Sequence, residues 1–397
     1  MNKYAIIRIS VNKIHEIGIL KLIWINDSHG TSQSVAATNR MCFRGSPMFQ
    51  AVNNSKTTSV LPRNCTFTES DWTILAGFWH PVAFAHEVSD KPVGARLLDV
   101  DLVIYRTLSG VSVARDICPH RGTRLSAGWM DGDRLVCPMH GLCYDHSGAC
   151  VKIPSVPEKD ARIPPRMHLQ SLLSEERYGI IWACLTEAPT HPSPVWPGIE
   201  DETLKKIHVP SGTWHAAASR HVENFNDVAH FPFVHKETFG GYEEDPIPNY
   251  EVKKTDYGLT FDLPYLEAGN RFPDDIEGDE RHVVYTYQLT LPFSTIIIIK
   301  PSEGHYAQYF ADTVCPVSAH ETRIFQVVTD TTGDPDEEFL IKESLMINDE
   351  DKSMVEGQRP EDLPLDIMEE IHIPADRMSV EYRRTLAKLG LGAPFSS

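Results

Sequence analysis

The stretches Cys118-Pro-His120 and Cys137-Pro-Met-His140, with sixteen residues between them, decide how this chain is interpreted. Each stretch supplies one Cys and one His, and each is short enough to form a loop between two strands. Two thiolates and two imidazoles can hold a two-iron, two-sulfide cluster, in which both Cys bind one iron and both His bind the other. The spacing therefore predicts a [2Fe-2S] cluster held by Cys118, His120, Cys137 and His140.

A structural zinc site is the alternative for these four residues, because two Cys and two His also suit tetrahedral Zn²⁺. Zinc fingers usually place a pair of Cys first and a pair of His later. Here each loop mixes the two residue types, which favours the cluster. Cys143 and Cys150 follow closely without matching His residues, so we interpret them as buried or surface thiols.

The segments around these loops have the pattern of a small β domain. Leu97–Arg106 and Val111–Ile117 are apolar, β-branched runs separated by Ser109-Gly110, which predicts a hairpin. Tyr178–Leu185 reads as a further strand. Four prolines then fall within Pro189–Pro197, which predicts a linker and a domain boundary near residue 190.

The second half of the chain has the pattern of an antiparallel sheet covered by helices, an α+β arrangement. Its expected strands are His282–Leu291, Ser294–Lys300, Tyr306–Val314 and Thr322–Thr329, and its expected helices are Glu337–Ile347 and Asp376–Leu389.

Residues 1–67 lack such patterning. The stretch from Ser28 to Asn64 is rich in Ser, Thr and Asn, so we expect a poorly ordered N-terminal extension. Met48 is an alternative to Met1 as the start of the chain. No apolar run is long enough to cross a membrane, and we expect a cytoplasmic location by default.

Bulk composition excludes several classes of protein. The 397 residues carry a formal net charge of −18, which makes nucleic acid an unsuitable partner. The eight cysteines are too few for a disulfide scaffold in a chain of this length. No G-x-G-x-x-G fingerprint of nicotinamide or flavin binding is present, so electrons must come from a separate protein.

The extended loops, Cys118-Pro-His-Arg-Gly122 and Cys137-Pro-Met-His-Gly141, resemble the cluster loops of the Rieske non-haem iron oxygenases. These are the α subunits that hydroxylate, dihydroxylate or demethylate aromatic compounds, the phenoxybenzoate dioxygenase type among them. The resemblance extends to Phe78–Pro81 and Val151–Ser155. It implies an all-β Rieske domain at residues 68–190 and an antiparallel-sheet, helix-grip (START-like) catalytic domain at residues 191–397. It also implies a second, mononuclear iron in the catalytic domain.

A second metal motif is present where the resemblance requires one. Asp227, His230 and His235 follow the pattern D-x2-H-x4-H. On a helix Asp227 and His230 would share a face, and Pro232 would bend or end that helix before His235. Two His and one carboxylate with open positions for O2 form the facial triad of non-haem Fe²⁺ oxygenases. We expect Asn224 and Phe225 to line the pocket beside it.

The third ligand is implied by the register of the resemblance. The acidic segment from Ile347 to Pro360 looks like the family segment that supplies the carboxylate, and Asp351 occupies the ligand position. Asp349 and Glu350 are nearby carboxylates that could be confused with it. The resemblance gives Asp227 a different role, as the bridge between a Rieske His of one subunit and an iron-binding His of the next, which implies a homotrimer.

The activity implied is that of a terminal oxygenase component. A reductase with a flavin and a ferredoxin-type cluster passes electrons from NAD(P)H, and the oxygenase uses O2 to hydroxylate, dihydroxylate or O-dealkylate a small aromatic substrate. Aryl ethers and aromatic carboxylates are the favoured substrates, and aromatic catabolism is the expected context. The alternatives are a Rieske electron carrier with a ligand-binding domain but no oxygenase activity, and a zinc-stabilised binding protein.

Overall fold

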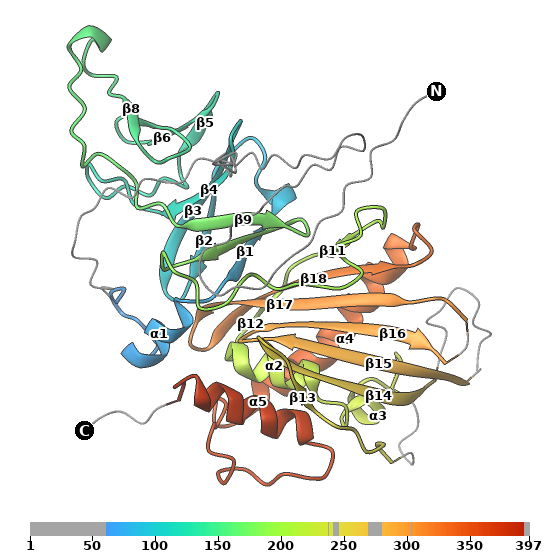
Figure 1. Ribbon diagram of the computed structural model, residues 1–397. Helices are drawn as coiled ribbons and strands as arrows, with labels where there is room; N and C mark the ends of the chain where they lie inside the picture. Colours follow the sequence, from blue (N-terminus) through green and yellow to red (C-terminus); the bar gives the residue numbers. More distant parts are fainter. Residues whose placement is uncertain (1–60, 237, 241–245, 269–279, 303, 393–397) are drawn as a thin grey trace, which may run out of the picture. The chain divides into compact units, whose positions relative to one another are not determined.

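The computed structural model describes residues 61–236, 238–240, 246–268, 280–302 and 304–392 (Figure 1). The N-terminal extension predicted at residues 1–67 therefore falls almost wholly outside the described residues, as does Met48. The residues from Ser55 to Ser397 form one compact unit. The described chain begins with the short helix α1 (Glu69–Leu75), whose N-cap Thr68 accepts a hydrogen bond from the Asp71 amide.

Three small antiparallel sheets make up the first half of the described chain, as the β pattern predicted. The first has the order β1-β10-β9, the second β2-β3-β4 and the third β5-β6-β7-β8. The strands are β1 (His80–Phe84), β2 (Val93–Leu97), β3 (Val100–Thr107), β4 (Gly110–Arg115), β5 (Trp129–Asp131), β6 (Arg134–Val136), β7 (Cys143–Tyr144), β8 (Cys150–Lys152), β9 (Leu173–Arg177) and β10 (Ile180–Cys184).

The strand predicted at Leu97–Arg106 is wrong at its start. Strand β2 ends at Leu97, and the chain turns at Leu98 and Asp99, whose φ angles are 49° and 62°. Two residues with positive φ form the tight turn that suits a right-twisted hairpin. Leu98 is fully buried, so the apolar run of the sequence continues through the turn. The sequence pattern therefore gives no sign of the turn.

The second half is built on one antiparallel sheet, as predicted, and this sheet has eight strands. Its order is β11-β18-β17-β16-β15-β14-β13, and β12 also pairs with β18. The strands are β11 (Ile207–Val209), β12 (Thr213–Trp214), β13 (Lys253–Lys254), β14 (Gly258–Ala268), β15 (Glu280–Thr290), β16 (Ser294–Pro301), β17 (Gln308–Ser318) and β18 (Glu321–Asp330). All four predicted strands are present, whereas the long strand β14 and the short strands β11, β12 and β13 were not predicted.

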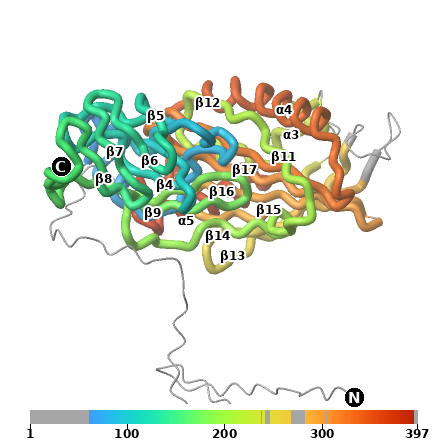
Figure 2. The backbone as a smooth tube through the Cα atoms, turned by 90° about the horizontal axis from the view of Figure 1, so that it is seen from above, coloured from blue at the N-terminus to red at the C-terminus, as the bar shows by residue number. Residues whose placement is uncertain are grey.

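Four helices accompany this sheet: α2 (Ala218–Asn226), α3 (Phe231–Val234), α4 (Glu337–Gly357) and α5 (Arg377–Lys388). Helix α4 lies along one side of the sheet (Figure 2). Both predicted helices exist, but α4 runs ten residues past the predicted end at Ile347. Because of this extension the whole acidic segment up to Gly357 is helical.

The proline-rich segment at Pro189–Pro197 contains no helix or strand, in agreement with its composition. It is nevertheless packed into the core. Trp196 is 1% exposed, stacks on Tyr178 at 4.7 Å between ring centroids, and donates its indole N–H to Ser294. One apolar core accordingly includes residues from both halves of the described chain.

Candidate metal centres and substrate pocket

The two Rieske-motif loops have the same backbone geometry. In each loop the amide of the Cys donates to the carbonyl five residues later, and the amide of the Gly four residues later donates back to the carbonyl of the Cys. All four distances lie between 2.9 and 3.0 Å. Gly122 and Gly141 have φ angles of 73° and 66°, a region that residues with a Cβ rarely adopt. The two glycines therefore allow both loops to fold back tightly.

The four predicted cluster ligands differ in exposure. Cys118 and Cys137 are 2% and 1% exposed, whereas His120 and His140 are exposed, with their ring centroids 4.5 Å apart. Burial raises the pKa of the Cys137 thiol, and the neighbouring Cys118 thiol adds to the rise. The phenol of Tyr144 lies 3.1 Å from the Cys118 sulfur. Once Cys118 is a thiolate, only the phenol can donate this hydrogen bond.

The zinc alternative fits this arrangement less well. Among the residues that the structure describes, one group of at least three His, Cys, Asp or Glu side chains has donor atoms all within 4.8 Å of one another. This group contains none of the four predicted cluster ligands. The donors of a single tetrahedral zinc would converge more closely than that. A wider spread suits a group with two metals, bound by Cys at one and by His at the other.

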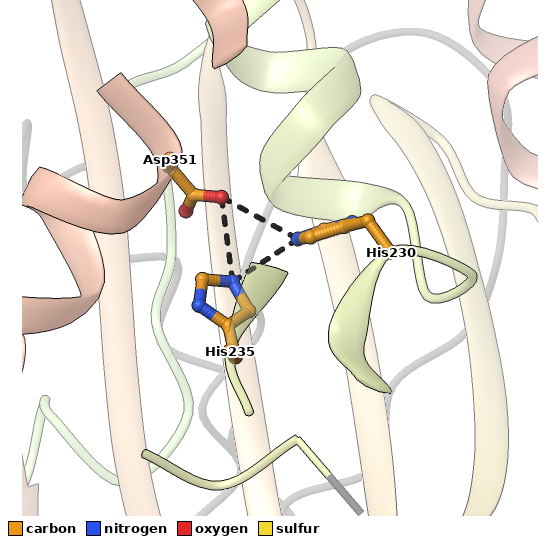
Figure 3. Close-up of side chains that lie close together, drawn as sticks. All are labelled: His230, His235 and Asp351. Atoms are coloured by element: carbon orange, nitrogen blue, oxygen red, sulfur yellow. Dashed lines mark hydrogen bonds and ion pairs between the residues drawn. The ribbon is translucent and has the colours of Figure 1, made fainter. Parts of the chain in front are cut away.

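The group that does converge is His230, His235 and Asp351 (Figure 3). The Nε2 atoms of the two imidazoles are 3.1 Å apart. Oδ1 of Asp351 lies 3.5 Å from Nε2 of His230 and 3.3 Å from Nε2 of His235. Two donors about 2.1 Å from one metal and at right angles to each other are about 3.0 Å apart. The three edges are close to the values for three ligands on one face of a metal ion.

The burial of these atoms agrees with a metal site. Oδ1 of Asp351 is buried and has no hydrogen-bond partner in the described structure. A buried carboxylate oxygen without a partner is costly, and a cation bound between the two imidazoles would compensate it. Burial alone would raise the pKa of Asp351, but the imidazoles of His235 and His230 and a hydrogen bond from Asn224 lower it. The donor set therefore fits a mononuclear Fe²⁺.

The local backbone differs from the predicted helix. Helix α2 ends at Asn226, and Asp227 and His230 lie in the non-helical connection to α3. The carboxylate of Asp227 holds this connection, because its Oδ2 accepts from the amide of His230 at 3.1 Å and from its Nδ1 at 2.7 Å. Pro232 lies in the first turn of α3, where proline is tolerated, and does not end a helix.

Each imidazole of the triad has a carboxylate behind it. Asp227 accepts from Nδ1 of His230, as described above, and Glu350 accepts from Nδ1 of His235 at 2.8 Å. Glu350 also accepts from the hydroxyl of Thr238 at 3.0 Å. Such partners fix the ring orientation and leave Nε2 for the metal. Sequence reasoning treated Glu350 only as a competitor for the ligand position, so this contact was missed, and Asp349 is exposed.

In both carboxylate–imidazole pairs, Glu350 with His235 and Asp227 with His230, charge attraction and hydrogen bonding shift a pKa toward the charged form of the group. Burial alone would lower the pKa of His235, but Asp351 and Glu350 outweigh burial and raise it. Burial alone would raise the pKa of Asp227, but the ring and amide of His230 outweigh burial and lower it. Both shifts favour oriented, charge-assisted hydrogen bonds around the triad.

A pocket that is partly open to solvent adjoins the triad, and most of its lining is apolar, as is usual for a site that binds a small organic ligand. All three triad residues line it, as do Asn224 and Phe225, which the sequence placed there. His221, which no sequence motif singled out, also lies in the wall. The remaining lining residues are Phe231, Phe239, Tyr285, Tyr287, Ile297, Ile299, Phe310, Gln326, Ile347 and Asn348. Flat aromatic and aliphatic surfaces beside a metal triad suit an aromatic substrate.

Family models match both halves of the chain. The model described as the Rieske [2Fe-2S] domain matches residues 78–172, and that described as the vanillate O-demethylase oxygenase C-terminal domain matches residues 214–391. Cluster loops, triad and pocket together with these matches define a class of protein, and the chain belongs to the Rieske non-haem iron oxygenases as an oxygenase subunit. It is an O2-using oxidoreductase with a Rieske cluster and a mononuclear iron, and its electrons come from a reductase.

Within this class the chain is similar to demethylating enzymes. Methylxanthine N1-demethylase NdmA of Pseudomonas putida is 30% identical over 325 residues, covering 79% of this chain and 89% of that protein. Methylxanthine N3-demethylase NdmB of the same organism is 32% identical over 340 residues, covering 81% and 92%. The solved structure of NdmA with caffeine has a TM-score of 0.69 at 28% identity and covers 80% of this chain and 92% of that one.

One further finding concerns membranes. Within the described ranges, no helix combines the length and the apolar character that a membrane span requires.

Proposed function

We propose that this chain is the terminal oxygenase of an oxidative demethylase, which removes a methyl group from a ring nitrogen of a small aromatic compound or from an oxygen attached to its ring. The observation that carries the proposal is the facial triad of His230, His235 and Asp351 in the wall of an aromatic pocket. The demethylating relatives support monooxygenation over dioxygenation. Aryl methyl ethers, favoured from the sequence, are one substrate class of this reaction.

The residues divide into two metal-binding sets. Cys118, His120, Cys137 and His140 hold the cluster, as proposed from their spacing. His230, His235 and Asp351 hold the iron, which would supply the site where O2 is activated beside the substrate. The aromatic wall of the pocket binds the ring and excludes water from this site.

Asp227 is proposed as the link between the two metal sets across a subunit boundary in a homotrimer. Its carboxylate already accepts from His230, and its side chain is 22% exposed, so an oxygen atom can be reached by an imidazole of a second chain. The exposed imidazoles of His120 and His140 are the groups that such a contact requires. A reductase with a flavin and a ferredoxin-type cluster would deliver electrons from NAD(P)H, and the pathway would be aromatic catabolism in the cytoplasm.

The proposed reaction balances with one reductant. A methylated substrate R–X–CH3, with X a ring nitrogen or an oxygen attached to the ring, reacts with O2, NADH and a proton to give R–XH, formaldehyde, water and NAD⁺. One oxygen atom enters formaldehyde through the hydroxymethyl stage, and the other is reduced to water.

The test measures formaldehyde released per NADH oxidised, with anaerobically purified holoenzyme, a Rieske oxygenase reductase and two probes, caffeine and vanillate. Formaldehyde from either probe, lost in a His230→Ala variant that retains its cluster, supports the proposal. Reduction of the cluster without formaldehyde or a hydroxylated product from any methylated aromatic compound tested would favour the electron-carrier alternative. Zinc without acid-labile sulfide would contradict both.

A further inference from the structure

Four polar side chains form a hydrogen-bonded chain at the pocket wall, and we call them the polar quartet: Asn348, Gln326, Asp312 and His221. The amides of Asn348 and Gln326 bond reciprocally, with Nδ2 of Asn348 2.8 Å from Oε1 of Gln326 and Nε2 of Gln326 3.0 Å from Oδ1 of Asn348. Nε2 of Gln326 also donates to Oδ2 of Asp312 at 2.9 Å. Nε2 of His221 donates to Oδ1 of Asp312 at 2.9 Å.

The polar quartet gives the pocket no net positive charge. Asp312 is 1% exposed and lies behind His221 and Gln326, which line the pocket. With His221 neutral the quartet carries one negative charge, and with His221 protonated it carries none. None of the described residues that line the pocket is Lys or Arg. A carboxylate ligand would therefore find no unpaired cation in this wall.

The polar quartet does keep hydrogen-bonding capacity for a neutral ligand. A primary amide has two N–H groups and two lone pairs on its oxygen, and Asn348 uses one of each on Gln326. His221 is only 2% exposed, and its buried Nδ1 has no hydrogen-bond partner in the described structure. Buried polar atoms of this kind are normally satisfied, so a ligand or water is expected there.

The position of Asn348 connects the polar quartet to the triad. Asn348 and Asp351 are three residues apart on α4, so they lie on the same face with about 5–6 Å between their Cβ atoms. His221 lies on α2 one turn before Asn224 and Phe225, which also line the pocket. A flat ring that bonds to Asn348 therefore lies beside the metal-binding atoms.

We propose that the polar quartet selects a neutral, methylated ring compound whose edge carries a carbonyl next to a ring nitrogen, and disfavours aromatic carboxylates. Where the ring nitrogen carries a hydrogen, as in theobromine, this edge pairs with both the donor and the acceptor of Asn348, and where it is methylated, as in caffeine, the carbonyl uses the donor alone. A carboxylate offers only acceptors, and it would place a second negative charge near the buried Asp312. This inference rests on the proposed function and names the substrate class of the same pocket.

The test compares the binding of three probes to the reduced holoenzyme without O2, by titration calorimetry. Caffeine and theobromine are neutral rings with carbonyls beside ring nitrogens, whereas vanillate is an anion with an aryl methyl ether. We expect both neutral probes to bind at least about tenfold more tightly than vanillate, because like charges at close range and unpaired buried polar groups both weaken binding. Equal or tighter binding of vanillate overturns the proposal.

Two variants assign the selectivity to the polar quartet. Asn348→Ala should weaken theobromine binding about tenfold, since a buried hydrogen bond is lost. Met346→Ala is the matched control, because Met346 is exposed on the same helix and does not line the pocket. Asp312→Asn should narrow the difference between theobromine and vanillate by removing the negative charge. Unchanged ligand preference in both quartet variants, with native circular dichroism, contradicts the proposal.

Failure of this inference is distinguishable from failure of the proposed function. Formaldehyde release chiefly from vanillate would leave the demethylase function in place and overturn the selectivity. Tight binding of caffeine or theobromine without formaldehyde release would support the selectivity and contradict the demethylase function.

Discussion

The two candidate metal centres are built in opposite ways. The cluster loops lie within residues 118–142 and repeat one backbone pattern, with a Cys, a tight turn and a Gly in each loop. The triad takes His230 from the connection between α2 and α3, His235 from the end of α3 and Asp351 from α4, and the supporting contact from His235 to Glu350 spans 115 positions. A centre of the first kind depends on local turns. A centre of the second kind exists only when the sheet and α4 have packed.

The largest effect is expected from a substitution that removes the mononuclear iron site, which is the centre that depends on packing. Asp351→Asn should reduce the iron content from about three atoms per chain to about two and bring turnover to background, because the triad loses its charged ligand. Iron and sulfide analysis, together with the EPR spectrum of the reduced cluster, checks this. Asp349→Asn is the matched control, since Asp349 is exposed on the same helix. Full iron content in the Asp351→Asn variant would contradict the assignment.

The reciprocal substitution removes the Rieske cluster, which is the centre held by local turns. Cys137→Ser should abolish the acid-labile sulfide and the visible absorption of the cluster, while the mononuclear site still binds one Fe²⁺. Turnover with reductase is lost because electrons no longer arrive. Cys143→Ser, which changes another buried thiol of the same domain, should keep the cluster. If Cys137→Ser also lost the mononuclear iron, the two centres would not be independent.

An intermediate effect sharpens the comparison at the triad. Glu350→Gln should weaken Fe²⁺ binding by about 10–100-fold, because the carboxylate that orients His235 becomes a neutral amide. Titration of the iron-depleted mononuclear site with Co²⁺, followed by its visible absorption, measures this affinity without turnover. The rescue variant is Glu350→Asp, which retains the charge. An unchanged affinity in Glu350→Gln would show that His235 is held by packing alone.

The smallest effect concerns the cluster. Tyr144→Phe should lower the reduction potential, because the hydrogen bond to the Cys118 sulfur favours the more negative, reduced cluster. One hydrogen bond of about 1 kcal/mol corresponds to about 40 mV for one electron. A spectroelectrochemical titration measures the shift. Tyr105→Phe is the control, because the Tyr105 phenol bonds to the carbonyl of Asp145 and not to a sulfur. A potential that rises in Tyr144→Phe would contradict the argument.

Sequence could reveal the cluster loops because their whole pattern is local. It could also reveal the His pair at 230 and 235, and four strands of the large sheet with regular apolar runs. Strand β14 was missed because Pro264 lies within it, and a proline normally argues against a strand. Strand β13 pairs only with Leu259 and Thr260, so no bond from β13 is interrupted at Pro264.

The contacts that sequence could not supply are those made across the fold. By its own pattern the segment after Ile347 reads as a run of solvated acidic residues, and only the family resemblance pointed to Asp351. Burial against the sheet and α2 shows that Asp351 faces inward while Asp349 faces water. The polar quartet joins α2, two strands and α4, and no periodicity records such a meeting. His221 therefore had no signal in the sequence beyond its identity.

The length of α4 has a consequence for how this family of pockets can diverge. Asn348, Glu350 and Asp351 sit on one uninterrupted helix, so their angular positions are set by 100° per residue and their heights by about 1.5 Å per residue. Substitution at position 347 or 348 can change the ligand preference of the pocket while the side chain of residue 351 keeps its orientation toward the metal site. Insertion or deletion of a single codon in this stretch would rotate every later side chain out of place. We expect natural drift here to proceed by replacement at constant length.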